Sequence, residues 1–197
     1  MTKHLAKDQR RSELLNAAVS CFAEQGYHET TMDDVVRAAG VSKGSLYWHF
    51  KSKRDLFLCL IELWFGELGQ FLDGVIEQDL PAGERLRLIG ETVENSVLAR
   101  PDLARAFIEF GSLAMRDTAL KFWFADVYKT NLGMIRRLIE EGIAQGEFRA
   151  VDPGVLAQLI VAMFDGTFMQ RELVREDPAA ALRLRDLIEA LLGLLRP

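Results

Sequence analysis

Cysteine, histidine and proline are scarce in this 197-residue chain, which contains two, three and five of them. No two residues among His4, His28, His49, Cys21 and Cys59 have the spacing of a helical metal pair, so we expect no metal site. Both cysteines lie in apolar helical patterns, which favours buried free thiols over a disulfide. Such thiols suit a reducing cytoplasm.

Long apolar runs and catalytic motifs are also missing. No run approaches the roughly 18 apolar residues that span a bilayer, and the N-terminus has no apolar core of a signal peptide. We therefore expect a cytoplasmic protein with no membrane partner. The sequence contains no G-x-S-x-G motif, no Walker loop and no dinucleotide-binding glycine pattern, so we expect neither an enzyme nor a cofactor.

The charge balance is acidic overall but uneven along the chain. The net charge is -5, which by itself argues against a nucleic-acid partner. Residues 1–55, however, carry nine basic and seven acidic side chains, whereas the remaining residues carry 15 and 22. This asymmetry is the pattern of a small DNA-binding domain joined to an acidic domain, although the pattern alone is weak.

Helical periodicity is nearly continuous, and signals for β-strands are rare. With 49% hydrophobic residues the chain can fill a substantial core. We expect an all-α fold of about nine helices, because glycine, proline and capping residues divide the sequence at regular places. The expected helices cover about residues 8–25, 32–39, 42–49, 52–80, 82–99, 102–115, 118–145, 153–175 and 178–195.

The most informative segment is TTMDDVVRAAGVSKGSLYWHFKSKRDL, residues 30–56. Thr30 or Thr31 can cap the second helix, Gly40 allows a tight turn, and Ser42 can cap a short third helix. Leu46 would pack inward. The segment therefore has the parts of a helix-turn-helix, whose second helix is free to enter a major groove.

This segment resembles the signature of the TetR family of transcriptional regulators, in which a threonine opens the second helix and a pattern like aGvs.gtlY.hF.sK follows. The resemblance implies a three-helix DNA-binding domain, residues 1–52, and a ligand-binding and dimerisation domain, residues 53–197. It implies operator DNA and a small apolar effector as partners, with repression as the commoner mode. The alternative is a helical dimeric ligand-binding or adaptor protein that does not bind DNA.

Site residues follow from the resemblance position by position. Thr31 and Lys53 would hold phosphates, although Thr31 could be only a helix cap. Tyr47 and His49 would contact the DNA backbone, although a lone histidine often only packs in the core or caps a helix. The candidates for base contacts are Ser42, Lys43, Gly44, Ser45 and Trp48. We expect Phe50 to belong to the core.

The second domain is rich in aromatic and methionine side chains, which either fill a core or line an apolar cavity. The candidate ligand-binding residues are Trp64, Phe65, Asn95, Phe107, Phe110, Trp123, Asn131 and Asp165. For any single apolar residue the core interpretation is favoured, and Asn95 and Asn131 could equally face solvent. Asp165 and Gly166 lie in the middle of a helix, where glycine suggests a close approach of helices.

The last two helices carry more apolar residues than a small bundle is expected to bury, which predicts a homodimer built from them. The residues concerned are Val155, Leu156, Leu159, Ile160, Met163, Phe164, Leu182, Leu184, Leu187, Ile188, Leu191, Leu192 and Leu195.

Overall fold

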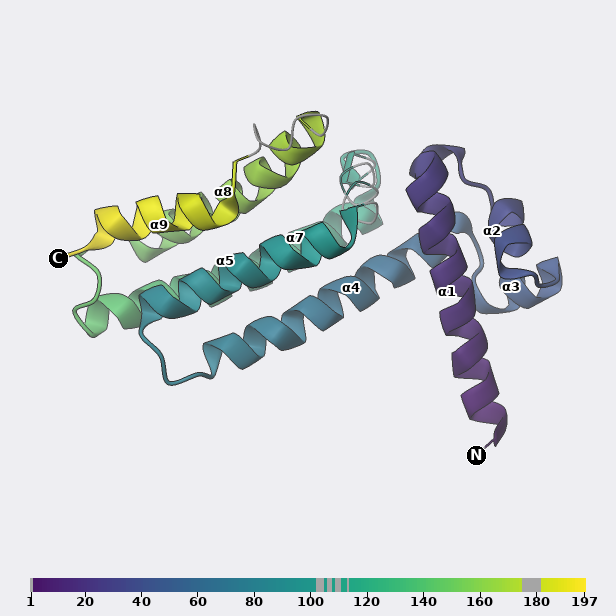
Figure 1. Ribbon diagram of the computed structural model, residues 1–197, viewed down its shortest axis with the longest axis horizontal. Coiled ribbons are helices and arrows are strands. Elements are labelled where there is room, and N and C mark those ends of the chain that lie inside the picture. The colour runs from purple at the N-terminus through teal and green to yellow at the C-terminus, as the bar shows by residue number, and fades with distance from the viewer. Residues whose placement is uncertain (1, 102–104, 106–107, 109–110, 113, 175–181) are drawn as a thin grey trace. The chain divides into compact units, whose positions relative to one another are not determined.

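The computed structural model describes the chain apart from residues 1, 102–104, 106–107, 109–110, 113 and 175–181. Over the described residues the secondary structure is helical and contains no strand, which confirms the all-α class. The helices are α1 (Thr2–Glu29), α2 (Met32–Ala39), α3 (Lys43–His49), α4 (Lys53–Ile76), α5 (Ala82–Ala99), α7 (Thr118–Ala144), α8 (Pro153–Leu173) and α9 (Leu184–Leu195) (Figure 1).

The chain divides into two compact units. The head unit contains Met1–Glu67 and Arg100–Phe110, and the body unit contains Leu68–Ala99 and Gly111–Pro197. Helix α4 begins in the head unit and ends in the body unit. The boundary expected between residues 52 and 53 separates a DNA-binding from a ligand-binding domain, and this division by function stays a prediction.

Local capping explains the short helices of the head unit. Thr31 caps α2: its hydroxyl accepts from the amide of Asp34, whose carboxylate accepts from the amide of Thr31. Gly40 ends α2 with φ +63°, in the left-handed region that glycine enters without a steric penalty. Ser42 then caps α3 by accepting from the amide of Ser45.

The helix-turn-helix rests on a well-packed core. Leu14, Val35, Leu46 and Phe50 are at most 2% exposed, so α1, α2 and α3 each bury part of one face. The ring of Phe57, at the start of α4, is also fully buried. The expectation that Phe50 is a core residue is confirmed.

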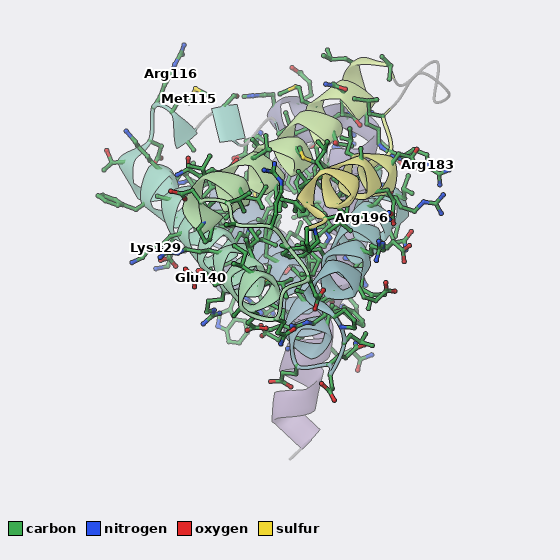
Figure 2. The ribbon with its side chains drawn as sticks, turned by 90° about the vertical axis from the view of Figure 1, so that its left-hand side faces the viewer. Met115, Arg116, Lys129, Glu140, Arg183 and Arg196 are labelled. Atoms are coloured by element: carbon green, nitrogen blue, oxygen red, sulfur yellow. The ribbon has the colours of Figure 1, made fainter. Side chains whose placement is uncertain are left out.

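The body unit packs α5, α7, α8 and α9 around a second apolar core. Fully buried members from three of these helices are Ile89, Ile139 and Ile160, with Ile188 of α9 at 3% exposure. Figure 1 shows the four helices side by side, and in Figure 2 they are seen nearly end-on, with Lys129 and Arg183 pointing outward. Charged side chains thus cover a core built from helical faces.

Three expected boundaries were wrong. Helix α1 begins at Thr2 rather than near residue 8, and its helical geometry breaks at Gly26, close to the expected end. Helix α4 ends at Ile76, whose carbonyl accepts a hydrogen bond from Arg85 at 3.0 Å. Helix α9 begins at Leu184, because residues 182–183 are not helical. The helix expected over residues 102–115 lies largely outside the described residues.

Candidate nucleic-acid interface and effector region

Helix α3 has an inner and an outer face. Leu46 is fully buried, and its neighbours Tyr47 and Trp48 are 49% and 66% exposed. On the same helix, or at its cap, Ser42, Lys43 and Gly44 are exposed, whereas Ser45 and His49 are half-buried. The residues expected to contact DNA bases and the DNA backbone therefore lie on one short helix or at its cap. The outer face of this helix carries aromatic, hydroxyl and cationic groups.

Two of these side chains have close neighbours within the head unit. The Lys43 ammonium donates to a carboxylate oxygen of Asp33 on α2 at 2.7 Å, and this hydrogen bond raises the pKa of Lys43. The rings of Trp48 and His49 meet edge to face, with centroids 4.6 Å apart. Lys43 is thus charged and positioned at the outer surface, and sequence reasoning did not identify Asp33 as its neighbour.

The start of α2 is occupied by its own side chains. The Thr31 hydroxyl donates to the Asp34 carboxylate at 2.6 Å, and the Thr31 amide donates to the same oxygen. These hydrogen bonds, the one from the side chain being the larger effect, lower the pKa of Asp34. Thr31 is therefore a helix cap, as the alternative interpretation expected, and its contact with phosphate stays a prediction.

Lys53 has an unexpected environment. Its ammonium donates to the carbonyls of Tyr27 and His28, at 2.7 and 2.9 Å, and lies 4.7 Å from the centre of the Tyr27 ring. Loss of hydration lowers the pKa of Lys53, partly opposed by Glu29. The sequence assigned this residue to a phosphate; in the structure, two of its three N–H donors bind the end of α1.

The expected ligand-binding residues fall in both units. In the head unit, Trp64 is 5% exposed and Phe65 is half-buried, with ring centroids 5.5 Å apart. In the body unit, Trp123 and Asn131 are half-buried and Asn95 is exposed. Phe107 and Phe110 lie outside the described residues. Asn95 thus faces solvent, which was one of the two alternatives for it.

Asp165 on α8 accepts a hydrogen bond from the hydroxyl of Tyr128 on α7 at 2.8 Å. Loss of hydration is the main cause that raises the pKa of Tyr128 to about 12 and also raises that of Asp165. Asp165 is an exposed residue, although neighbouring atoms still reduce the hydration of its carboxyl group. Tyr128 was not among the expected site residues, because the two positions are 37 residues apart.

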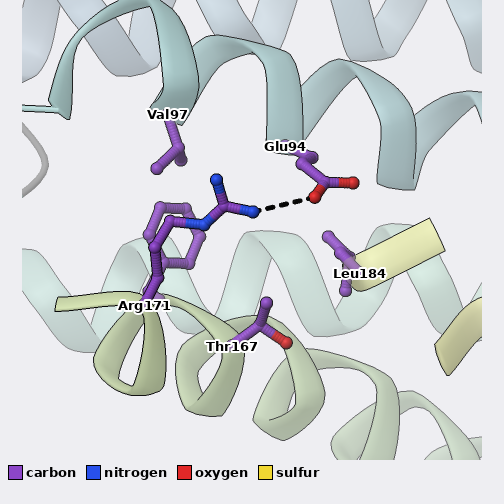
Figure 3. Close-up of a pocket in the computed structure, with 6 residues that line it drawn as sticks. Glu94, Val97, Thr167, Arg171 and Leu184 are labelled. Atoms are coloured by element: carbon purple, nitrogen blue, oxygen red, sulfur yellow. Dashed lines mark hydrogen bonds and ion pairs between the residues drawn. The ribbon is translucent and has the colours of Figure 1, made fainter. Parts of the chain in front are cut away.

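A small pocket of the body unit lies between α5 and α8 (Figure 3). Arg171 and Glu94 form an ion pair at 2.9 Å on its wall, and the Glu94 side chain is 10% exposed. Val97 and Thr167 also line the pocket, which has room for about one water molecule, about 10 Å³. The sequence did not predict this pair, because its members are 77 residues apart.

Within the described ranges, no group of three or more histidine, cysteine or acidic residues could hold a metal ion. None of the helices in those ranges is long and apolar enough to cross a membrane. Cys21 and Cys59 are buried free thiols, as the sequence predicted.

The capped helix pair with a solvent-facing second helix defines a helix-turn-helix protein of the DNA-binding type. Residues 14–60 match the family described as bacterial regulatory proteins, tetR family. Residues 82–196 match the family described as BetI-type transcriptional repressor, C-terminal. The chain belongs to the TetR family of transcriptional regulators. Regulators of this family bind operator DNA and small ligands and are typically dimers.

Individual relatives resemble the chain over most of its length. An uncharacterised HTH-type transcriptional regulator of Bacillus subtilis, YfiR, is 30% identical over 174 residues, which are 88% of this chain and 85% of the relative. The fatty acid metabolism regulator protein of B. subtilis is 28% identical over 82% of each chain. The crystal structure of FadR from B. subtilis in complex with stearoyl-CoA superimposes with a TM-score of 0.71 at 25% identity, covering 93% of this chain and 96% of that one.

Proposed function

We propose that this protein is a ligand-responsive repressor, which binds a pseudo-palindromic operator as a homodimer through α3 and is released by a small apolar ligand. The observation that carries the proposal is the outer face of α3. Tyr47 and Trp48 are exposed aromatic side chains beside the cation Lys43, on a helix whose other face is anchored by Leu46. Exposed rings of this kind contact sugars and methyl groups well when a helix lies in a major groove.

A gel-shift assay with DNA fragments that flank the protein's own gene tests this proposal. The full chain should retard at least one fragment and ignore a duplex of scrambled sequence, and a variant with Tyr47→Ala and Lys43→Ala should lose the retardation. If no fragment is retarded while the protein still dimerises and binds ligand, the alternative of an adaptor without DNA-binding activity takes precedence.

The dimer is proposed from the outer faces of α8 and α9. Val155, Leu159, Met169 and Leu173 are between 48% and 77% exposed, and with Ala162 and Gly166 they repeat along α8 at spacings of three and four. On α9, Leu194 is 69% exposed, and Leu187 and Leu191 are half-buried. These are apolar stripes on neighbouring helices, and a second copy would cover them as a four-helix interface.

Other residues of the expected dimer set face the protomer's own core. The structure buries Leu156, Ile160, Leu184, Ile188, Leu192 and Leu195. The expectation that both sets belong to the interface was too broad, because sequence periodicity does not separate two buried faces of one helix. We assign only the exposed stripes to the partner.

Gly166 lies in the middle of the α8 stripe. Among the described residues, a Cβ at this position would meet no atom within 4 Å, so no neighbour there requires a glycine. Glycine destabilises a helix by about 1 kcal/mol relative to alanine. The open site leaves room for α8 of a second copy to approach closely at the centre of the stripe.

We propose an acyl-bearing ligand, on the support of the fatty acid metabolism regulator and of the stearoyl-CoA complex named above. Ligand pockets have volumes of roughly 300 Å³ or more, far above that of the pocket in Figure 3. A ligand that enters there has to enlarge the space between α5 and α8, which the Arg171–Glu94 ion pair joins. Ligand entry would therefore move helices of the body unit. Release from DNA also requires a movement of helices.

Tryptophan fluorescence tests the ligand proposal. In a Trp48→Phe background, Trp64 and Trp123 should report binding of long-chain acyl-CoA, which should weaken operator binding by about 5- to 150-fold. Reciprocity requires that the operator weakens acyl-CoA binding by the same factor. If acyl-CoA binds and operator affinity does not change, the ligand does not control DNA binding.

A further inference from the structure

We propose that Lys53 is a positioning residue, whose ammonium joins the start of α4 to the end of α1 and thereby orients the helix-turn-helix. The inference rests on the proposed function of α3. It begins from the two carbonyl contacts of this ammonium, with Tyr27 at 2.7 Å and His28 at 2.9 Å.

These carbonyls lie between Gly26, where the helical geometry of α1 breaks, and Glu29, where α1 ends. The last four carbonyls of a helix have no partner within it. Glu29 ends the helix, so Tyr27 and His28 need partners from elsewhere, and Lys53 supplies one for both. An ammonium that satisfies two such carbonyls stabilises the junction through charge-assisted hydrogen bonds.

Aromatic packing holds the same junction. Tyr27 is 6% exposed, and its ring centroid lies 4.9 Å from that of Phe57, which belongs to α4. The ring of Tyr27 also lies 4.7 Å below the Lys53 ammonium. The end of α1 and the first turns of α4 thus meet through a cation, two carbonyls and two rings, all within the head unit.

The junction lies immediately before α2. Only Glu29 and Thr30 separate His28 from Thr31, the cap of α2, and the buried Thr30 hydroxyl donates to the Gly26 carbonyl at 2.7 Å. A change in the direction of α4 at Lys53 therefore reaches the first turn of α2 through a short, hydrogen-bonded segment. From α2 it passes to the recognition helix α3.

The ammonium of Lys53 is held within the head unit. Its side chain is half-buried, and two of its N–H groups are already engaged, so one donor remains. Lys51, two residues earlier, is exposed. Lys51 therefore provides a matched control, as a nearby lysine whose removal takes away surface charge without affecting the α1–α4 junction.

The experiment uses the full-length chain with Lys53→Met, Lys53→Gln and Lys51→Met, and it has two readouts. Hydrogen exchange at the amides of residues 31–35 is measured without DNA, so it tests the junction even if no duplex binds. Operator affinity is then measured as a function of salt concentration. Glutamine keeps a neutral donor for one carbonyl, and both substitutions at Lys53 remove the same charge.

We expect exchange in Lys53→Met to be about tenfold faster than in the wild type, consistent with the loss of charge-assisted hydrogen bonds. Lys53→Gln should lie in between, and Lys51→Met should match the wild type. Operator binding should weaken in the same order, and the salt slope reports separately whether Lys53 also contacts a phosphate.

The inference is overturned if both Lys53 variants reduce the slope by about 0.9, the value for one lost phosphate contact, while exchange stays at the wild-type rate. Exchange no faster than in Lys51→Met also overturns it, whatever the slope. Failure of the wild type to bind any duplex counts against the proposed function and leaves the exchange result to decide on the junction.

Discussion

The Lys43 ammonium lies 2.7 Å from a carboxylate oxygen of Asp33, which joins the start of α3 to the first turn of α2. Both side chains are exposed, by 66% and 52%, so water screens the pair and Lys43 can exchange Asp33 for an acceptor on DNA at little cost. Asp33 also places a negative charge beside the proposed DNA-binding face.

This pair predicts opposite effects for its two members. Lys43→Ala should reduce the preference for the operator over scrambled DNA by about tenfold, because a base contact is lost. Asp33→Asn should instead strengthen binding to both duplexes, because a carboxylate repels phosphates. Fluorescence anisotropy measures both affinities, and Asp73→Asn, an exposed acid of the body unit, is the control. Unchanged preference in Lys43→Ala would exclude this lysine from base readout.

The dimer predicts that Gly166 is sensitive to size. Gly166→Leu should leave the protomer helical, because the site is open within the chain, but it should convert the dimer to a monomer at micromolar concentration. Sedimentation velocity gives the oligomeric state, and circular dichroism gives the helix content. Gly74→Leu on α4, at an exposed and equally open position, should stay dimeric. A dimeric Gly166→Leu variant would place the interface elsewhere.

The Tyr128–Asp165 hydrogen bond predicts a pH dependence of stability. Because burial raises the pKa of Asp165 above its usual 3.8, the folded protein holds this proton more tightly than the unfolded chain does. The contribution of this group to stability is therefore full below about pH 3.8 and is lost as pH rises through the folded pKa. Asp165→Asn should raise the melting temperature at pH 7.5, and its advantage should shrink as pH falls toward 4.5.

Tyr128→Phe is the control for this prediction. The phenol lowers the pKa of Asp165, so its removal should raise that pKa further and lower the stability at pH 7.5. The pKa of Tyr128 itself, about 12, keeps the phenol protonated across this range. A melting-temperature difference between wild type and Asp165→Asn that does not vary with pH would show that the pKa of Asp165 is not raised in the folded protein.

Two glycines of α7 predict opposite responses to alanine. A Cβ at buried Gly142 would overlap the Phe148 ring and lie 3.0 Å from the Cβ of Ala82, whereas one at Gly133 meets nothing within 4 Å. Overpacking costs about 1–3 kcal/mol, and the gain in helix propensity is about 1 kcal/mol. Gly142→Ala should therefore lower the free energy of unfolding by about 1 kcal/mol, and Gly133→Ala should raise it by up to about the same amount. Urea denaturation measures the free energy of unfolding of both variants. An equal change in the two would mean that the Phe148 ring moves aside to accommodate the new methyl group.

Local chemistry made the helix-turn-helix predictable from the sequence. The caps Thr31 and Ser42, the turn at Gly40 and the burial of Leu46 each depend on residues within a few positions of one another. Their side-chain chemistry decides the backbone conformation directly, so a short segment contains all the information required. The all-α class followed in the same way from helical periodicity.

Contacts between distant positions were not predictable in this way. Arg85 donates to the carbonyl of Ile76 at the end of α4, and the Arg171–Glu94 and Tyr128–Asp165 pairs join helices that are remote in sequence. Periodicity identifies an apolar face but not its partner, so it could not separate the buried face of α8 from the exposed one. The second role of Lys53 was missed for the same reason, because the carbonyls of α1 carry no side-chain signature.

Footprinting of the operator selected by gel shift tests most directly whether this dimer reads DNA through α3. The wild type should protect two half-sites whose centres lie one helical turn, about 10 base pairs, or a multiple of it apart. Trp48→Ala should change the preferred bases within each half-site and leave their spacing unchanged, because spacing is set by the dimer and base choice by α3. A single protected patch, or a base preference that Trp48→Ala and Lys43→Ala both leave intact, would contradict the assignment of α3 to the groove.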